Sequence, residues 1–415
     1  MGKGRATYVL ALKNIGGKSF GLAIAVVLIV SSPGQAIWLG QSQVNPYLEI
    51  QEQYESNVFR ASTSGQVENV LVTVISPGLH VEFPTAKDSA YRFLANYRAN
   101  LNFYNKHGDA QVDPDSQLNS TEHRFDAQAR LNFASGVNFM TGYILNLGSV
   151  APHFLRDTRD KYTEHEIQAQ TGYKFTDAYE LQVSYDGIFR RFDKETVIVD
   201  GVPVKDDLNT QSLDATVSYR LFPSLSVLGG GGYTAVTRKA FSDSNEYRGF
   251  GGIRYEATAR LIGLVKAGMV RKKIIDEDSV NTSVFALGEL TADFSEDTKL
   301  LLAANRNIGD TSTVNNSANN GTYYIVTGAR ATLTHKFASL PKLSSSALLG
   351  YQRKTYPDDI ADREDNILEA GLGAEYKFLK YIILGLNYSY NNTDSSLDSY
   401  DFNDSIVILS VSAKL

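Results

Sequence analysis

The residues best suited to binding a polar ligand lie in two neighbouring segments, where similar side chains recur at even spacing. Guanidinium and amide groups of one parity stand at Arg92, Asn96, Arg98, Arg124 and Arg130. Residues two apart in an extended chain point to the same side, so these groups would share one face. Arginine forks bind carboxylates, and amides exchange hydrogen bonds with hydroxyls. We therefore expect this face to bind a substrate rich in hydroxyl or carboxylate groups, such as a sugar chain.

A second interpretation is that the same face forms a lattice of ion pairs that braces a wall. Further charges share its parity: Lys174, Arg190, Arg220, Arg254, Arg330 and Lys336, with Glu122, Asp126, Glu164, Glu166, Glu180, Asp186, Asp214, Glu369 and Glu375. Opposite charges on adjacent strands stabilise a sheet. The patch of Arg92, Arg98, Arg124 and Arg130 is denser in positive charge than a neutral brace requires. If anions are selected, we expect selection at this patch.

Catalysis and metal binding have less support. His123 and His165 fall on the opposite face, and a hydrolase would need a nucleophile at matching depth. Their segments supply threonines and no serine of the right parity. The acidic loop segments lack the spacing of a calcium loop, and no nucleotide-binding motif occurs. We expect no enzyme activity, no metal site and no cofactor.

The segments that carry these residues alternate strictly between apolar and polar side chains. In residues 91–104, Tyr91, Phe93 and Tyr97 take one face, while Arg92 and Asn96 take the other. The same pattern recurs along most of the chain. Such long alternation is typical of a sheet with lipid on one side and water on the other.

Turns divide the chain into about eighteen such segments. Tight turns near residues 83–84, 134–136, 176–177, 222–223, 258–259, 295–296, 340–341 and 379–380 alternate with longer polar connections. The last segment, residues 404–415, is amphipathic and would close the sheet against a first strand near Pro46. The pattern predicts an all-β fold: a transmembrane antiparallel up-and-down β-barrel with short periplasmic turns and longer extracellular loops.

The start of the chain has the composition of a secretory signal peptide. Four basic residues precede the apolar run 21–30, and a small-residue site predicts cleavage after Ala36. A membrane-anchoring helix is the alternative interpretation. We expect a signal peptide over residues 1–36 and a single barrel domain over residues 37–415.

Bulk composition agrees with an exported barrel. The mean hydropathy is -0.22 and 21% of residues are charged, because alternation hides a lipid-facing surface from any average. Loss of four basic residues with the leader would change the formal charge from -6 to about -10. This acidic balance argues against nucleic acid as a partner. The absence of cysteine indicates a fold that needs no disulfide.

The first mature segments support a more specific assignment. Residues 45–50 read NPYLEI, residues 54–60 read YESNVFR, and residues 68–70 and 75–79 read ENV and ISPGL. These residues resemble the opening hairpin of the β-barrel porin family found with bacterial exopolysaccharide synthesis and export machinery. The resemblance implies an eighteen-stranded barrel in the bacterial outer membrane and a role in the passage of exopolysaccharide or capsular polysaccharide.

Membership would also imply partners. These are outer-membrane lipid and lipopolysaccharide, the outer-membrane assembly machinery, the polysaccharide chain and a periplasmic polysaccharide export protein. Eighteen tilted strands enclose a backbone cylinder about 35 Å across, wide enough for one hydrated glycan strand. A general diffusion porin for small solutes and a structural or adhesive barrel remain alternatives. No loop long enough to constrict the lumen is evident, and either parity suits residues 261–272.

Overall fold

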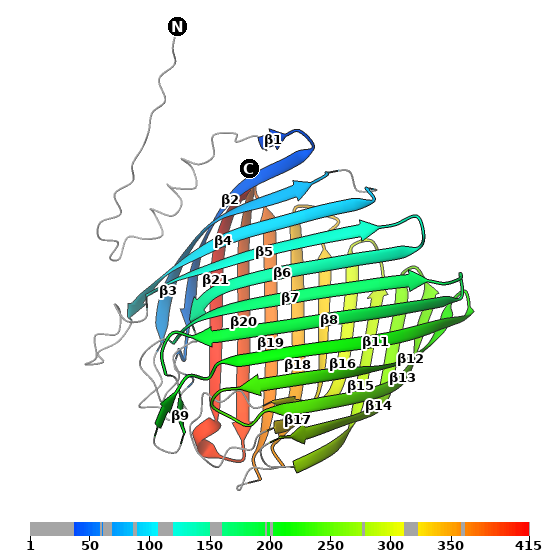
Figure 1. Cartoon of the computed structure of the whole chain (residues 1–415). Helices are drawn as coiled ribbons and strands as arrows, with labels where there is room; N and C mark the ends of the chain where they lie inside the picture. Colours follow the sequence, from blue (N-terminus) through cyan, green and yellow to red (C-terminus); the bar gives the residue numbers. More distant parts are fainter. Residues whose placement is uncertain are drawn as a thin grey trace.

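The computed structural model is a closed β-barrel (Figure 1). It describes residues 37–58, 60, 69–85, 89–106, 119–149, 160–195, 197–199, 202–275, 279–310, 323–357 and 362–414. The predicted signal peptide and its cleavage site at Ala36 lie outside the described residues. Each long strand pairs antiparallel with the next long strand along the chain, and β21 pairs with β2, so the sheet closes on itself.

Eighteen long strands form the wall. The first nine are β2 (Ser42–Glu55), β3 (Val70–Phe83), β4 (Tyr91–Lys106), β5 (Ser120–Asn132), β6 (Val137–Ser149), β7 (Lys161–Lys174), β8 (Tyr179–Phe192), β11 (Leu208–Phe222) and β12 (Leu225–Arg238). The other nine are β13 (Ser244–Thr258), β14 (Leu261–Ile274), β15 (Ser279–Asp293), β16 (Thr298–Asp310), β17 (Tyr323–Lys336), β18 (Leu343–Thr355), β19 (Glu364–Lys377), β20 (Ile382–Ser395) and β21 (Phe402–Lys414). The predicted up-and-down barrel is confirmed.

Short elements lie at the ends of this wall. Strand β1 (Ile37–Leu39) pairs with the start of β2. Strands β9 (Val197–Val199) and β10 (Val202–Val204) form a hairpin in the connection between β8 and β11, and the 3-10 turn η1 (Asp398–Tyr400) precedes β21. Among the described residues, no helix is long and apolar enough to cross a membrane.

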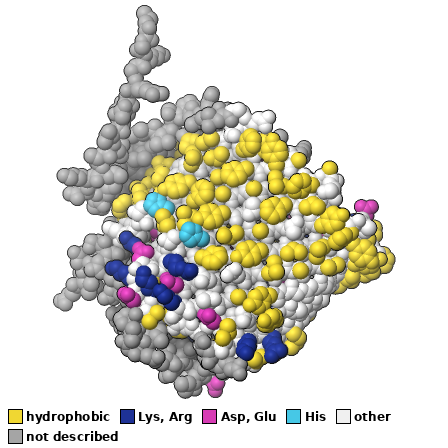
Figure 2. Space-filling model, in the orientation of Figure 1, with side chains coloured by type: hydrophobic (Ala, Val, Ile, Leu, Met, Phe, Trp, Pro, Cys, Tyr) yellow, Lys and Arg dark blue, Asp and Glu magenta, His cyan; other side chains and the backbone are white. Residues whose placement is uncertain are grey.

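The apolar parity of each strand forms the outer surface. Tyr91, Phe93 and Tyr97 of β4 are all more than 40% exposed, because in the isolated chain nothing covers the side that lipid would contact. Figure 2 shows this surface as a broad field of hydrophobic side chains over one side of the barrel. Side chains of register partners on adjacent strands point to the same face of the sheet. Because successive side chains alternate between the two faces, the polar residues of each strand face the lumen.

The structure settles the register that sequence left open. In β14, Val265 and Met269 are exposed on the outer face, whereas Val270 is fully buried on the inner face. Lys266 and Lys272 therefore also face inward. Leu261 ends this outward series at the periplasmic turn.

Among the described residues, the ladder between β3 and β4 skips Ser76 and Pro77, and a longer interruption lies between β15 and β16 at the extracellular end. Strand β15 pairs with β14 along its length as far as Ser279, but its pairing with β16 stops at Ala286 and Arg306. Beyond Arg306, residues 307–310 pair with residues 323–326 of β17 alone. The end of β16 has left the wall on the lumen side, as its packing shows below.

Candidate functional site: the lumen of the barrel

The predicted ligand-binding residues lie together on the inner wall. Register pairs Arg92 with Arg130 and Arg98 with Arg124 across β4 and β5, and Asn96 faces Asp126 between them. Asn96 and Arg98 line a hollow of about 560 Å³ that extends over β2, β3, β19, β20 and β21. The sequence thus predicted which side chains meet. That they bind a substrate stays a prediction.

The positive charge of this patch is offset by acidic partners. Arg92 forms an ion pair with Glu82 at 2.7 Å, and Arg124 forms one with Asp126 at 2.8 Å. Arg98 lies 3.6 Å from a carboxylate oxygen of Glu49 and donates to the Asn100 side chain. Three of the four arginines of the patch therefore have an acidic neighbour. Glu49 and Glu82 belong to the first hairpin, and only the register shows that they face these arginines.

Two predicted residues of the patch have neutral partners. The nearest polar contact of Arg130 is the Met140 sulfur, 3.9 Å from its Nη2. A hydrogen bond of 2.6 Å joins Asn96 Oδ1 to the His80 ring. Arg130 is thus the member of the patch whose charge is least compensated by the described residues.

Cations also line the opposite arc, near the periplasmic turns. Lys174, Arg220, Arg254 and Lys266 line a hollow of about 500 Å³ over β7 to β14. In the described part of the chain, neither Lys174 nor Arg220 has a carboxylate within ion-pair distance. The Lys266 ammonium lies 4.9 Å from the Phe250 ring centroid. Sequence analysis missed Lys266 because the parity of β14 was ambiguous.

Elsewhere on the inner wall, ion pairs brace neighbouring parts of the sheet. Arg190 of β8 contacts Glu164 of the adjacent β7 at 2.6 Å. Arg330 of β17 contacts Glu369 of β19 at 3.4 Å, across Gly350 of β18. Arg248, which was not among the predicted lumen charges, contacts Asp214 at 2.7 Å. The bracing interpretation therefore describes these parts of the wall, and ligand binding by the lumen stays a prediction.

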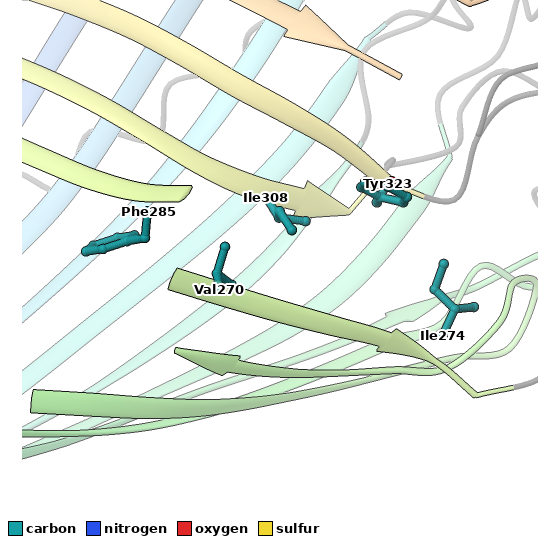
Figure 3. Packing of buried hydrophobic residues seen from close by; sticks show 5 residues of the cluster. All are labelled: Val270, Ile274, Phe285, Ile308 and Tyr323. Atoms are coloured by element: carbon teal, nitrogen blue, oxygen red, sulfur yellow. The ribbon is translucent and has the colours of Figure 1, made fainter. Parts of the chain in front are cut away.

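The extracellular half of the lumen contains apolar clusters instead. Val270 and Ile274 of β14, Phe285 of β15, Ile308 of β16 and Tyr323 of β17 are all at least 92% buried and pack together. Figure 3 shows Val270 and Ile308 pointing towards each other. Val270 lies on the inner face of β14, so the displaced end of β16 lies inside the barrel. The sequence showed no loop long enough to constrict the lumen, and the structure places the end of a strand inside it instead.

A second apolar cluster lies on the inner face of β3. It comprises Val58, Val70, Val72 and Val74, with Tyr104 packed against it. The preceding residue, Asn57, is 1% exposed, and its backbone N–H donates to Asp404 at 3.2 Å. The connection after β2 is thereby held inward over β3. In the extracellular half, the inner face is thus apolar and covered by packed side chains at two places, over β3 and over β14.

A polar network holds the extracellular ends of β18, β19 and β20 together. Arg363 binds Asp365 through two hydrogen bonds of 2.6 and 2.8 Å, and its guanidinium lies 3.5 Å from the Tyr400 ring centroid. Ser395 and Tyr356 also donate to Asp365. Burial raises the pKa of the Tyr356 hydroxyl, as does the Asp365 charge, so this group remains a donor.

The two outward histidines near the extracellular strand ends, His123 and His165, bind tyrosines. A bond of 2.9 Å joins the His123 ring to the Tyr97 hydroxyl, and one of 2.7 Å joins His165 to Tyr143. In the described part of the chain, neither ring bonds a serine. Aromatic girdles hold such pairs at a membrane interface. No group of three or more His, Cys, Asp or Glu side chains that could hold a metal ion occurs among the described residues.

The closed wall, the apolar surface that faces lipid and the polar inner face together define an outer-membrane barrel of the porin class. Residues 35–415 match the family described as "Putative beta-barrel porin 2". The chain belongs to this family and is an outer-membrane protein. The resemblance seen in the opening hairpin is confirmed at the level of the family, whose members are typically not enzymes.

Solved structures with a similar fold include Pseudomonas aeruginosa OpdO, at 12% identity, with 90% of this chain and 98% of that chain covered and a TM-score of 0.48. Pseudomonas aeruginosa OpdQ matches at 13% identity, 91% and 99% coverage and a TM-score of 0.47. A bacterial polysaccharide outer-membrane secretin matches at 12% identity, 89% and 98% coverage and a TM-score of 0.35. No functionally curated protein matches the chain.

Proposed function

We propose that this barrel is a conduit that takes part in the export of exopolysaccharide or capsular polysaccharide across the outer membrane. The observation that supports this proposal best is the pair of polar hollows on opposite arcs of the inner wall. One combines Asn45, His80, Asn96 and Ser410 with charged groups, and the other combines Gln182, Thr216 and Ser218 with cations and carboxylates. Mixed amide, hydroxyl and cationic groups match the hydroxyls and carboxylates of a glycan.

The inward end of β16 is the part of the conduit that must move. A lumen narrowed by apolar contacts obstructs a hydrated chain, whereas the polar periplasmic half accommodates it. Residues 307–310 have no ladder hydrogen bonds to β15, so their displacement costs side-chain packing and breaks no pairing with that strand. We propose that polymer passage displaces this end towards the wall. Energy for the movement would come from synthesis or from a periplasmic export protein acting as partner.

Deletion of the gene, with wild-type complementation as the control, tests the function. We expect surface polysaccharide to disappear while uptake of small sugars stays normal. Normal polymer on the surface of the deletion strain would contradict export. Rapid entry of small sugars into liposomes containing the protein would instead support a diffusion porin, and loss of adhesion with intact polymer would support a structural barrel.

A further inference from the structure

The outer surface of the barrel carries its own charge pattern. In the described strands, every lysine or arginine on the outward parity lies near an extracellular strand end, and none lies near a periplasmic turn. These residues are Lys161, Arg191, Arg271, Lys273, Arg306 and Arg353. Figure 2 shows a group of basic side chains at the border of the hydrophobic field, beside the histidines.

These cations are concentrated on one arc. From β7 to the regular part of β16, which ends at Arg306, no acidic residue of the described strands has the outward parity. On the other strands the outward acids are Glu52, Glu364 and Asp394, which lie on β2, β19 and β20. Arg353 on β18 forms an ion pair with Glu364. The arc from β7 to β16 is therefore the positively charged part of the outer interface.

Lys161 and Arg191 form the core of this arc. Arg191 faces Thr163 across β7 and β8, and Lys161 is two residues further along the same face. The two cations are thus diagonal neighbours about 7–8 Å apart. Arg191 is anchored on the wall, because Nη2 donates to Asn209 at 2.6 Å and Nη1 to the Leu208 carbonyl. Lys161 is exposed and has no ion-pair partner in the described residues.

The surroundings of this pair carry charges of both signs. Lys194 lies just beyond the end of β8, and the Lys205 ammonium donates to the Asp193 carbonyl at 2.9 Å. The acids nearby are Asp160, Asp193, Glu195 and Asp207, and the Asp207 carboxylate accepts from the Phe192 N–H. Lys161 and Arg191 themselves lie on the outward face, at the level where the apolar surface ends and lipid headgroups begin.

We infer that Lys161 and Arg191 bind a phosphate of a lipid headgroup in the outer leaflet, the leaflet that carries the bisphosphorylated lipid A of lipopolysaccharide. Position supports this partner, because the cations occur at the outer interface and are absent from the outward face near the periplasmic turns. Charge-assisted hydrogen bonds from a guanidinium and an ammonium are the usual ligands of phosphate. The exposed acyl-facing side chains below them complete an amphipathic site.

The test compares binding of bisphosphoryl lipid A to detergent-purified protein by native mass spectrometry. The variant is Lys161→Gln/Arg191→Gln. The matched control is Arg260→Gln/Lys380→Gln, which removes the same charge from exposed positions in periplasmic turns. We expect about tenfold weaker binding in the first variant and wild-type binding in the control. A heat-modifiability gel shows whether each variant has folded.

Three ligands identify what is recognised. We expect monophosphoryl lipid A to bind more weakly than the bisphosphoryl form, and both phosphatidylethanolamine and inorganic pyrophosphate to bind without sensitivity to Lys161 and Arg191. Equal lipid A affinity in the two variants would overturn the inference. The inference would also be overturned if the protein bound pyrophosphate and the Lys161→Gln/Arg191→Gln variant did not, because the site would then recognise free phosphate.

Discussion

The two halves of this lumen follow the same alternation and yet end in opposite states. Near the periplasmic turns, the inner face is open and carries cations such as Lys174 and Arg220 in a polar hollow. Near the extracellular end, Val270 and Ile308 are buried against each other inside the barrel. The comparison teaches that alternation determines which side chains face inward. The position of the strand ends determines whether the interior is open to water or filled by packed apolar side chains.

The difference arises where the end of β16 leaves β15. Strand β16 is regular up to Arg306, and its outward residues there face lipid. Ile308 has the same parity, but it contacts the inner face of β14 because the strand end has moved inside the wall. One outward apolar residue thereby becomes part of a constriction. A covered apolar surface inside a porin is then stabilised by the same burial that stabilises a soluble core.

A disulfide across the constriction should have the largest effect. The chain has no cysteine of its own, so Val270→Cys/Ile308→Cys places two thiols in a packed contact without competing pairs. If the end of β16 must move, oxidation should abolish polymer export in complemented cells, and reduction should restore it. The measurement is surface polysaccharide before and after reductant.

Ala304→Cys/Ala329→Cys is the matched control for the crosslink. These residues are register partners on the outer face of β16 and β17, below the departure point. A bond there joins strands that stay paired in either state, so export should persist. Export that survives the Val270–Ile308 crosslink would show that this end of β16 is not part of the path.

Removal of Asp365 should have the next largest effect. Its carboxylate is 2% exposed and bonds Arg363, Tyr356 and Ser395. Asp365→Ala leaves these donors without their acceptor, so the free energy of unfolding should fall by about 3 kcal/mol. Urea titration in lipid vesicles measures the loss.

The periplasmic half offers the comparison for this loss. Arg254 and Glu256 form an ion pair of 2.7 Å, but both side chains are about half exposed. Glu256→Ala should cost less than about 1 kcal/mol, because exposed pairs contribute little. Equal losses in the two variants would remove the energetic distinction between the halves.

Ion selectivity should change least. Lys174→Gln/Arg220→Gln removes cations that have no carboxylate partner among the described residues, so the anion-to-cation permeability ratio should fall roughly twofold. Arg92→Gln/Glu82→Gln is the control, because it removes a whole ion pair and leaves the net charge unchanged. Reversal potentials in asymmetric salt measure both ratios. A larger change of the permeability ratio in the control would show that ion selection occurs at the predicted arginine patch.

The sequence was sufficient for everything that alternation determines. Strand parity placed Arg92, Asn96 and Arg98 inside the barrel, and the chain-terminal amphipathic strand predicted closure against the strand at Pro46. Both rest on local periodicity and spacing. In β14, where either parity presents apolar residues to lipid, periodicity decided nothing and Lys266 was missed.

Contacts that depend on distant strands were beyond the sequence. Nothing near Arg98 indicated that Glu49 lies beside it, because that contact follows from register across β2, β3 and β4. Glu82 is only ten residues from Arg92, but their contact depends on the register between β3 and β4. The inward end of β16 left no local signal either, since Ile308 and Tyr323 suit a lipid-facing strand equally well. Their burial is a property of the assembled barrel.

Single-channel conductance in a planar bilayer tests most directly whether apolar packing closes the extracellular half. The pair to compare is the wild-type mature protein and Ile308→Asp, which places a charge in the cluster that contains Val270 and Phe285. We predict low conductance for the wild type and long open states for the variant, because a buried unpaired carboxylate disfavours the packed state. A wild-type conductance already equal to that of the variant, at the level of an open lumen about 35 Å across at the backbone, would contradict the account.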